Sequence, residues 1–214
     1  MIGLEINLTK TSCIRIGPRH DCDAVPITIE QKPLKWVKEI KYLGLRLVSA
    51  KKFTVNLQES RQNYIRALNG VIGKVGTESS PLVLSSLIES FCVPVLTYGA
   101  ESIVWSKSML NSCEQAYSQA YFKMFKTYDK AIIKQCQYYI GQLPIEYKIM
   151  CRKLHFINQL KNSMNSICMS LVKNNSEILC ICSNYNIPAN HCYNVKYYKT
   201  LLWQTFEREL SVIS

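Results

Sequence analysis

The sequence predicts an α+β fold in which short N-terminal β-hairpins precede a mostly α-helical part. Two observations predict this class. Apolar and polar residues alternate in short runs up to about residue 50, and after Lys51-Lys52 apolar residues recur at three- and four-residue steps. A chain of 214 residues with 48% hydrophobic residues can also bury a sizeable core. We therefore expect a folded protein that changes from strands to helices near residues 48–53.

The N-terminal part alternates with the period of β-strands. This pattern predicts strands at residues 3–8, 12–16, 26–29 and 40–47, with a Gly- and Pro-containing loop at 17–21. Together these strands define a first region, residues 1–50.

Helical patterns follow the Lys51-Lys52 junction. Between Val55 and Val75 one apolar stripe predicts an amphipathic helix: Tyr64, Ile65, Leu68, Val71, Ile72 and Val75. Its opposite face carries Gln62, Arg66, Asn69 and Gly73. Ser80-Pro81 predicts the start of a second helix, which Pro94 should kink or end.

Further helices are predicted at residues 108–128 and over most of 131–173, with a new start at Pro144. From Asn174 the chain is rich in Asn and Tyr, and we expect a loose tail there. The helical part therefore divides into a region at 51–130 and a connector with its tail at 131–214.

The charge balance favours a polyanionic partner. Lys and Arg number 26 against 15 Asp and Glu, a formal net charge of +11, and nucleic acid is the commonest polyanion that proteins meet. No apolar run reaches the roughly 18 residues of a membrane helix, and the N-terminus lacks the pattern of a signal peptide. We expect an intracellular protein without a membrane partner, in the nucleus or the cytoplasm. The ten cysteines lie mostly in apolar sequence, which favours reduced, buried thiols over a disulfide framework.

Three segments in fixed order resemble reverse transcriptases of non-LTR (LINE-type) retrotransposons. Residues 3–12 read Gly-Leu-Glu-Ile-Asn-Leu-Thr-Lys-Thr-Ser and are similar to that family's Gly-Leu-x-Ile-Asn-x-x-Lys-Thr segment after the catalytic turn. Residues 40–45, Ile-Lys-Tyr-Leu-Gly-Leu, resemble its primer-grip hairpin. Residues 60–87 resemble its thumb, and Pro94-Val-Leu-Thr-Tyr-Gly99 resembles the late thumb signature Pro-x-Leu-x-Tyr-Gly.

The resemblance implies the end of a polymerase palm, a primer grip, a thumb and a helical connector. The intact family performs RNA-directed DNA synthesis on a primer–template duplex of RNA and DNA, with two Mg²⁺ ions held by carboxylates. Two of those carboxylates belong to a Tyr-x-Asp-Asp turn, whereas this chain has no adjacent Asp pair, and Asp21 and Asp23 follow the lysine segment. The fingers and most of the palm would precede Met1. We therefore expect no cofactor and no primer extension from this chain alone, although it resembles an RNA-directed DNA polymerase.

The resemblance also implies roles for individual residues. Lys10 matches a lysine thought to protonate or neutralise the departing pyrophosphate, and Tyr42, Leu43 and Gly44 match the primer grip, where glycine permits a tight turn beside a phosphate. The polar face with Gln62, Arg66, Asn69 and Gly73 suits close approach to a duplex. The alternatives are a solvated lysine at a turn, an ordinary hairpin and a solvated helix face.

Other readings stay open. Cys180-Ile-Cys182 with His191-Cys192 suggests zinc, but the Cys-x-Cys spacing and the adjacent His-Cys pair fit structural zinc sites poorly, so no metal is predicted. The alternative to a polymerase fragment is a non-catalytic α+β protein that binds nucleic acid or another partner and derives from a retroelement.

Overall fold

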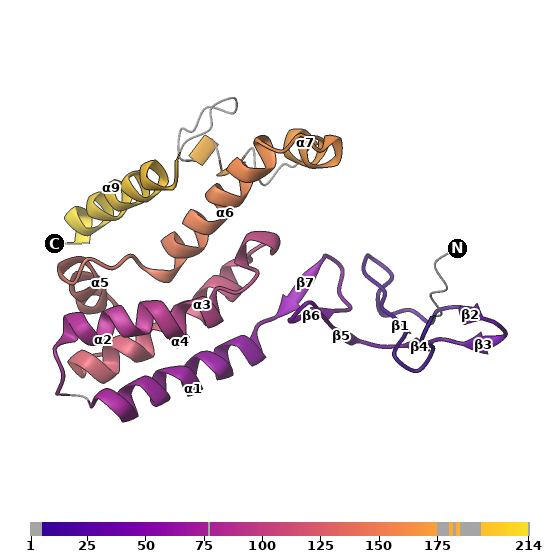
Figure 1. Ribbon diagram of the computed structural model, residues 1–214, viewed down its shortest axis with the longest axis horizontal. Helices are drawn as coiled ribbons and strands as arrows, with labels where there is room; N and C mark the ends of the chain where they lie inside the picture. The colour runs from indigo at the N-terminus through magenta and orange to yellow at the C-terminus, as the bar shows by residue number, and fades with distance from the viewer. Residues whose placement is uncertain (1–5, 77, 175–179, 182, 185–193, 214) are drawn as a thin grey trace. The chain divides into compact units, whose positions relative to one another are not determined.

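The computed structural model describes residues 6–76, 78–174, 180–181, 183–184 and 194–213 (Figure 1). It has the predicted α+β class, with short strands followed by mostly helical sequence. The chain forms two compact units, Met1–Glu59 and Ser60–Ser214. The division between the units thus follows Glu59, whereas the sequence predicted a boundary at residue 50. Residues 131–214 belong to the same unit as the helices before them.

The first unit contains three small sheets. Strands β1 and β4 pair in parallel, β2 and β3 form an antiparallel hairpin, and β5, β6 and β7 form an antiparallel meander in that order. The strands are β1 Ser12–Cys13, β2 Thr28–Ile29, β3 Lys32–Pro33, β4 Lys35–Trp36, β5 Glu39–Tyr42, β6 Leu45–Val48 and β7 Thr54–Asn56.

The predicted strands of this unit are correct in part. Of the strand expected at 3–8, the described residues 6 and 7 form no strand and Leu8 begins a turn at 8–10, and the strand expected at 12–16 ends at Cys13. The strand expected at 40–47 is two strands, β5 and β6, because Leu43 and Gly44 form a turn between them. Strands β3, β4 and β7 were not predicted. These strands have only two or three residues each, too few to show an alternating pattern, and β4 pairs with β1, which lies more than 20 residues earlier in the chain.

Helix α1, Gln58–Val75, begins directly after β7, so the predicted helical start at Val55 is wrong. The Asn56 side chain accepts a hydrogen bond from the Gln58 backbone N–H (2.9 Å), which provides an acceptor at the helix start. The predicted stripe is confirmed, since Tyr64, Leu68 and Ile72 are buried and the rest of the stripe is half-buried.

Pro94 interrupts the next helical segment as predicted. Helix α2, Pro81–Leu87, passes into the π-helical turn η1, Ile88–Cys92, and then into the short helix α3, Val93–Leu96. A π-turn shifts the hydrogen-bond register, which places Pro94 in the first turn of a new helix where its missing N–H costs nothing. Ser80 precedes α2, but its side chain makes no capping hydrogen bond.

The remaining helices are bounded by local signals. Ser106 and Asp129 accept hydrogen bonds from backbone N–H groups at the starts of α4 and α5, and Pro144 precedes α6. Their bounds, with the 3₁₀ turn η2 before them, are η2 Ala100–Ser102, α4 Lys107–Phe125, α5 Lys130–Tyr139, α6 Ile145–Lys161 and α7 Ser166–Asn174.

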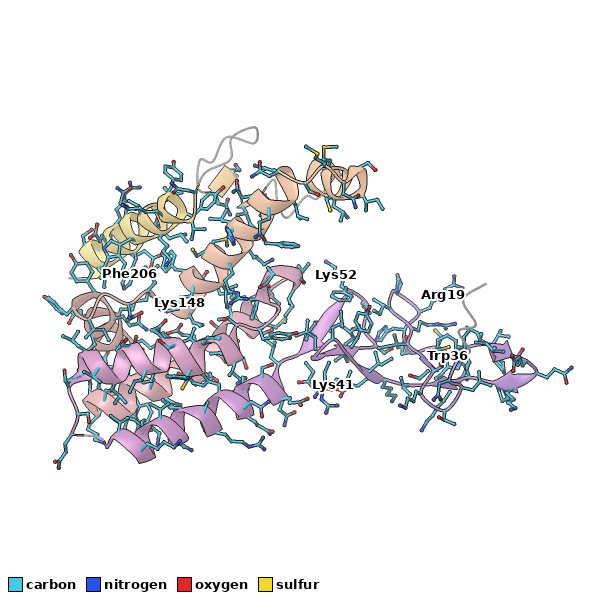
Figure 2. The ribbon with its side chains drawn as sticks, viewed as in Figure 1. Arg19, Trp36, Lys41, Lys52, Lys148 and Phe206 are labelled. Carbon is cyan, nitrogen blue, oxygen red and sulfur yellow. The ribbon has the colours of Figure 1, made fainter. Side chains whose placement is uncertain are left out.

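A long C-terminal helix replaces part of the expected loose tail. Helix α9, Val195–Ile213, packs on α5 and α6, and its Tyr198, Leu202 and Phe206 are buried. They join Leu154 and Ile157 of α6 in one apolar cluster. Phe206 is labelled on this helix in Figure 2. Apolar residues four apart at 198, 202 and 206 do indicate a helix in the sequence. The prediction of a loose tail was based instead on the Asn- and Tyr-rich residues that precede them.

The described cysteines are all free thiols. Cys92 and Cys113 are fully buried, whereas Cys22 and Cys180 are exposed. The expected reduced state therefore fits the structure, although only two of these thiols belong to the core.

Candidate nucleic-acid interface

Lys10 lies exposed in a tight turn of the first unit. Asn7 organises this turn: its side-chain oxygen accepts from the backbone N–H of Thr9 (3.1 Å) and Lys10 (3.2 Å), and its carbonyl accepts from the Thr11 hydroxyl (2.8 Å). The spacing Asn-x-x-Lys-Thr is therefore explained by this turn, because Lys10 and Thr11, three and four residues after Asn7, both donate hydrogen bonds to Asn7. The turn presents the Lys10 side chain to solvent, and residues 3–5 of the same segment lie outside the described residues.

Tyr42, Leu43 and Gly44 form the tip of the β5–β6 hairpin. Leu43 and Gly44 are the two central residues of the turn, with φ of 46° and 83°, the positive values that a type I′ turn requires. Positive φ suits glycine and costs a residue such as leucine about 1 kcal/mol or more. Tyr42 and Leu43 are 61% and 74% exposed, so the turn holds two large apolar side chains in solvent at an energetic cost.

Glu59 stabilises this hairpin from the first turn of α1, and sequence reasoning missed it. Lys41 and Arg46 lie directly opposite each other across β5 and β6, where like charges repel. Glu59 accepts from the Lys41 ammonium (2.7 Å) and from the Arg46 guanidinium (2.8 Å). These two hydrogen bonds, led by that from Lys41, lower the pKa of Glu59. The Glu59 carboxylate therefore offsets the repulsion between Lys41 and Arg46 next to the hairpin turn.

The polar face of α1 is exposed as predicted. Gln62, Arg66, Asn69 and Gly73 all lie in solvent, and so does Gly70, which the sequence reasoning did not include. Among the described residues, a Cβ atom at Gly70 or Gly73 would meet no heavy atom within 4 Å beyond its chain neighbours and the backbone of its own helix. Glycine costs a helix interior about 1 kcal/mol relative to alanine, so packing within the chain does not account for either residue.

The two arginines of α1 differ in their surroundings. Arg66 is exposed, and its Nη1 donates to the Asn63 side chain (2.9 Å), a local contact not anticipated from the sequence. Arg61 is half-buried, with its Nε atom fully covered and near enough to Cys113 to oppose the rise in that thiol's pKa. The structure thus separates an exposed cation from one that packs into the helical unit.

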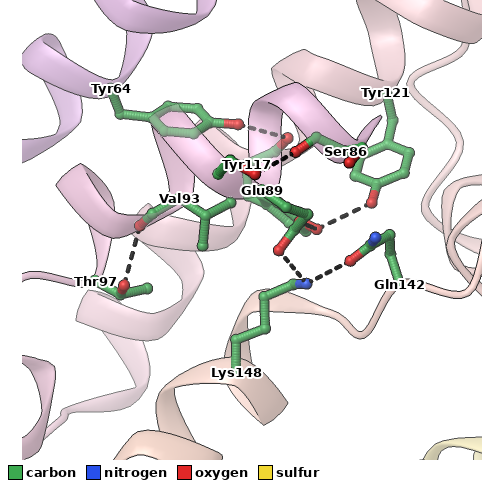
Figure 3. A network of polar contacts seen from close by, with 10 residues as sticks. Tyr64, Ser86, Glu89, Val93, Thr97, Tyr117, Tyr121, Gln142 and Lys148 are labelled. Carbon is green, nitrogen blue, oxygen red and sulfur yellow. Dashed lines mark hydrogen bonds and ion pairs between the residues drawn. The ribbon is translucent and has the colours of Figure 1, made fainter. Parts of the chain in front are cut away.

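A half-buried polar network lies within the helical unit (Figure 3). Glu89, in the π-turn η1, accepts from the Lys148 ammonium (2.8 Å) and the Tyr117 hydroxyl (2.9 Å), and Lys148 also donates to Gln142 (2.9 Å). Burial lowers the pKa of Lys148 and raises the pKa of Tyr117. No sequence motif indicated this network, because its members are far apart along the chain.

The two aspartates that follow the lysine segment, Asp21 and Asp23, lie in a loop of the first unit. Asp23 lies in a loop that wraps around Arg15, whose guanidinium donates to the backbone carbonyls of Arg19, Cys22 and Asp23 and stacks on Trp36 at 5.6 Å. Nowhere in the described part of the chain do three or more His, Cys, Asp or Glu side chains gather as metal ligands. The candidate zinc ligands Cys182, His191 and Cys192 lie outside the described residues.

None of the helices within the described ranges is long and apolar enough to cross a membrane. Comparisons of the chain with protein-family models, with curated proteins and with solved structures find no match.

Proposed function

We propose that this chain holds primer–template duplexes of RNA and DNA, as the primer grip and thumb of a non-LTR-type reverse transcriptase. The resemblance of three ordered segments is the basis of the proposal. Lys10 would lie where the departing pyrophosphate lies in an intact polymerase.

The hairpin tip is the observation that carries the proposal. A backbone in which Leu43 adopts positive φ is strained, and local strain concentrates at binding sites, where the surrounding structure maintains it. Asparagine would fit the same turn better. An exposed Tyr42-Leu43 pair beside Gly44 suits contact with the sugar and base of a primer end, while the glycine backbone lies near its phosphate.

The α1 face supports the same function. Its side chains are polar or absent, its one exposed arginine can reach phosphates, and the excess of Lys and Arg favours association with a polyanion. We infer that this face lies along the duplex backbone, where large side chains would prevent close approach.

The decisive experiment replaces the strained leucine. Leu43→Asn should stabilise the hairpin by about 1 kcal/mol and weaken binding of an RNA–DNA duplex with a recessed primer end about fivefold. The measurements are a thermal melt and fluorescence anisotropy at low salt.

The second hairpin of the same unit provides a matched control. Gln31 is a central turn residue between β2 and β3 with a φ of 63°. Gln31→Asn should relieve the same kind of strain without changing duplex affinity. If both variants change affinity equally, or neither does, the tip is not a primer grip.

A further inference from the structure

A recess in the helical unit brings together residues from α3, the α5–α6 connection, α6 and α9. Its volume is about 740 Å³, within the range of small-molecule binding pockets. Pro94, Gln142, Lys148, Arg152, Lys199 and Trp203 are among the residues that line it. Glu89, Gln142 and Lys148, which also line it, appear in Figure 3.

Positive charge exceeds negative charge along the lining. Lys148, Arg152 and Lys199 line the recess with Glu89 as their one carboxylate. Glu89 already accepts from Lys148 and from Tyr117. The carboxylate of Glu101 takes two of the five N–H donors of Arg152, at 3.1 and 3.4 Å.

Lys199 is the unbalanced cation. Its side chain is exposed, and within the described ranges no carboxylate lies within ion-pairing distance of it. It lies close enough to Lys148 to add repulsion to the effect of burial on that residue's pKa. An anion bound beside Lys199 and the remaining donors of Arg152 would relieve this repulsion.

Two contacts hold Trp203 in the apolar wall of the recess. The Trp203 ring stacks on Tyr138 (centroids 5.7 Å apart, planes 18° apart), and its Nε1 donates to Glu207 (2.9 Å). Val93 and Pro94 line the recess from α3. A ring held in this way presents a fixed surface to a flat apolar group at little entropic cost.

We propose that this recess binds a phosphate monoester of a sugar that carries a flat base, with the phosphate between Lys199 and Arg152 and the base against Trp203 and Pro94. A free nucleoside monophosphate and the 5′-phosphorylated end of a nucleic-acid strand both present this chemistry. The inference goes beyond the proposed duplex binding, because none of these residues belongs to the hairpin tip or to α1.

The test measures binding of AMP and adenosine to the full chain by calorimetry, in chloride buffer. AMP should bind, and adenosine should bind at least tenfold more weakly. Lys199→Gln should weaken AMP binding about tenfold without lowering the melting temperature, because Lys199 is exposed. Lys196→Gln is the matched control, since Lys196 is also exposed on α9 and does not line the recess. It should leave AMP affinity unchanged.

Two further comparisons identify the source of the phosphate and separate this inference from the proposed function. A short single strand with a 5′-phosphate that binds more tightly than AMP assigns the site to strand ends, and the reverse assigns it to free nucleotides. Arg66→Ala should not change AMP affinity, and Lys199→Gln should not change affinity for a duplex with 5′-hydroxyl ends. The inference is overturned if AMP does not bind, if adenosine binds equally well, or if the two lysine variants have equal effects.

Discussion

Cys92 and Cys113 illustrate how burial controls the chemistry of single residues. Both side chains are fully covered, and burial raises the pKa of each thiol from 9.0 to about 11. A raised pKa in the folded state stabilises the fold below pH 9, and this contribution is lost as the pH rises from 9 through 11. Tyr64, Tyr117 and Tyr121 act in the same direction, since burial raises their pKa values too.

This difference predicts graded thiol reactivity. With iodoacetamide at pH 8, Cys92 and Cys113 should react at least about 100-fold more slowly than the exposed Cys22 and Cys180, because the reactive thiolate is both scarce and inaccessible. Mass spectrometry of the digested protein measures each rate. In urea the four rates should converge, which serves as the control. Labelling of Cys113 at the rate of Cys22 in the native protein would contradict the described core.

At the scale of the element, α1 separates a packed face from a solvent face. Arg66→Ala should lower the salt dependence of duplex binding by about one unit and leave the melting temperature nearly unchanged, because Arg66 is exposed and its one described contact is within the helix. Arg61→Ala should mainly lower the melting temperature, because Arg61 packs into the unit. Anisotropy at several salt concentrations and a thermal melt test each variant. The reverse result would assign the wrong face to the duplex.

The glycine of the same face gives a second prediction. Gly73→Ala should stabilise the protein by up to about 1 kcal/mol, because alanine favours helix and its Cβ atom meets no neighbour. If the face approaches a duplex closely, the added methyl group should also weaken duplex binding. Denaturant unfolding and anisotropy measure the two effects. Gain of stability without loss of affinity would mean that Gly73 does not contact the duplex.

At the scale of the whole molecule, the two units differ in how much core they contain. Among the described residues of Met1–Glu59, only Val55 and Leu57 are buried apolar side chains, whereas the helical unit buries many, including Tyr64, Leu68 and Tyr117. Backbone hydrogen bonds with little apolar cover open at low free-energy cost.

Hydrogen exchange should therefore separate the units. At pH 7, amides of β5–β7 should exchange at least about 100-fold faster than interior amides of α4, which mass spectrometry of peptides can resolve. A hairpin peptide free in solution provides the upper limit of exchange. Equal protection of β5–β7 and α4 would show that the first unit is more stable than its core implies.

Features set by neighbours along the chain could be predicted from the sequence. The stripe of Tyr64, Leu68 and Ile72, the interruption at Pro94 and the helix start after Pro144 are local patterns, and each appears where expected. The polar face of α1 followed from the same periodicity. Within the candidate interface, the tight turn at Gly44 also required only the local sequence.

Only the tertiary structure decided which distant residues meet. The sequence by itself determined the α+β class, the faces of α1 and the excess of positive charge. The tertiary structure decided that Glu59 joins Lys41 and Arg46, that Glu89 meets Lys148, and that Lys199 reaches the same recess. The physical reason is that helix and strand patterns repeat over a few residues and can be read locally. These contacts join residues that are far apart along the chain, and no local sequence pattern indicates which residues will meet.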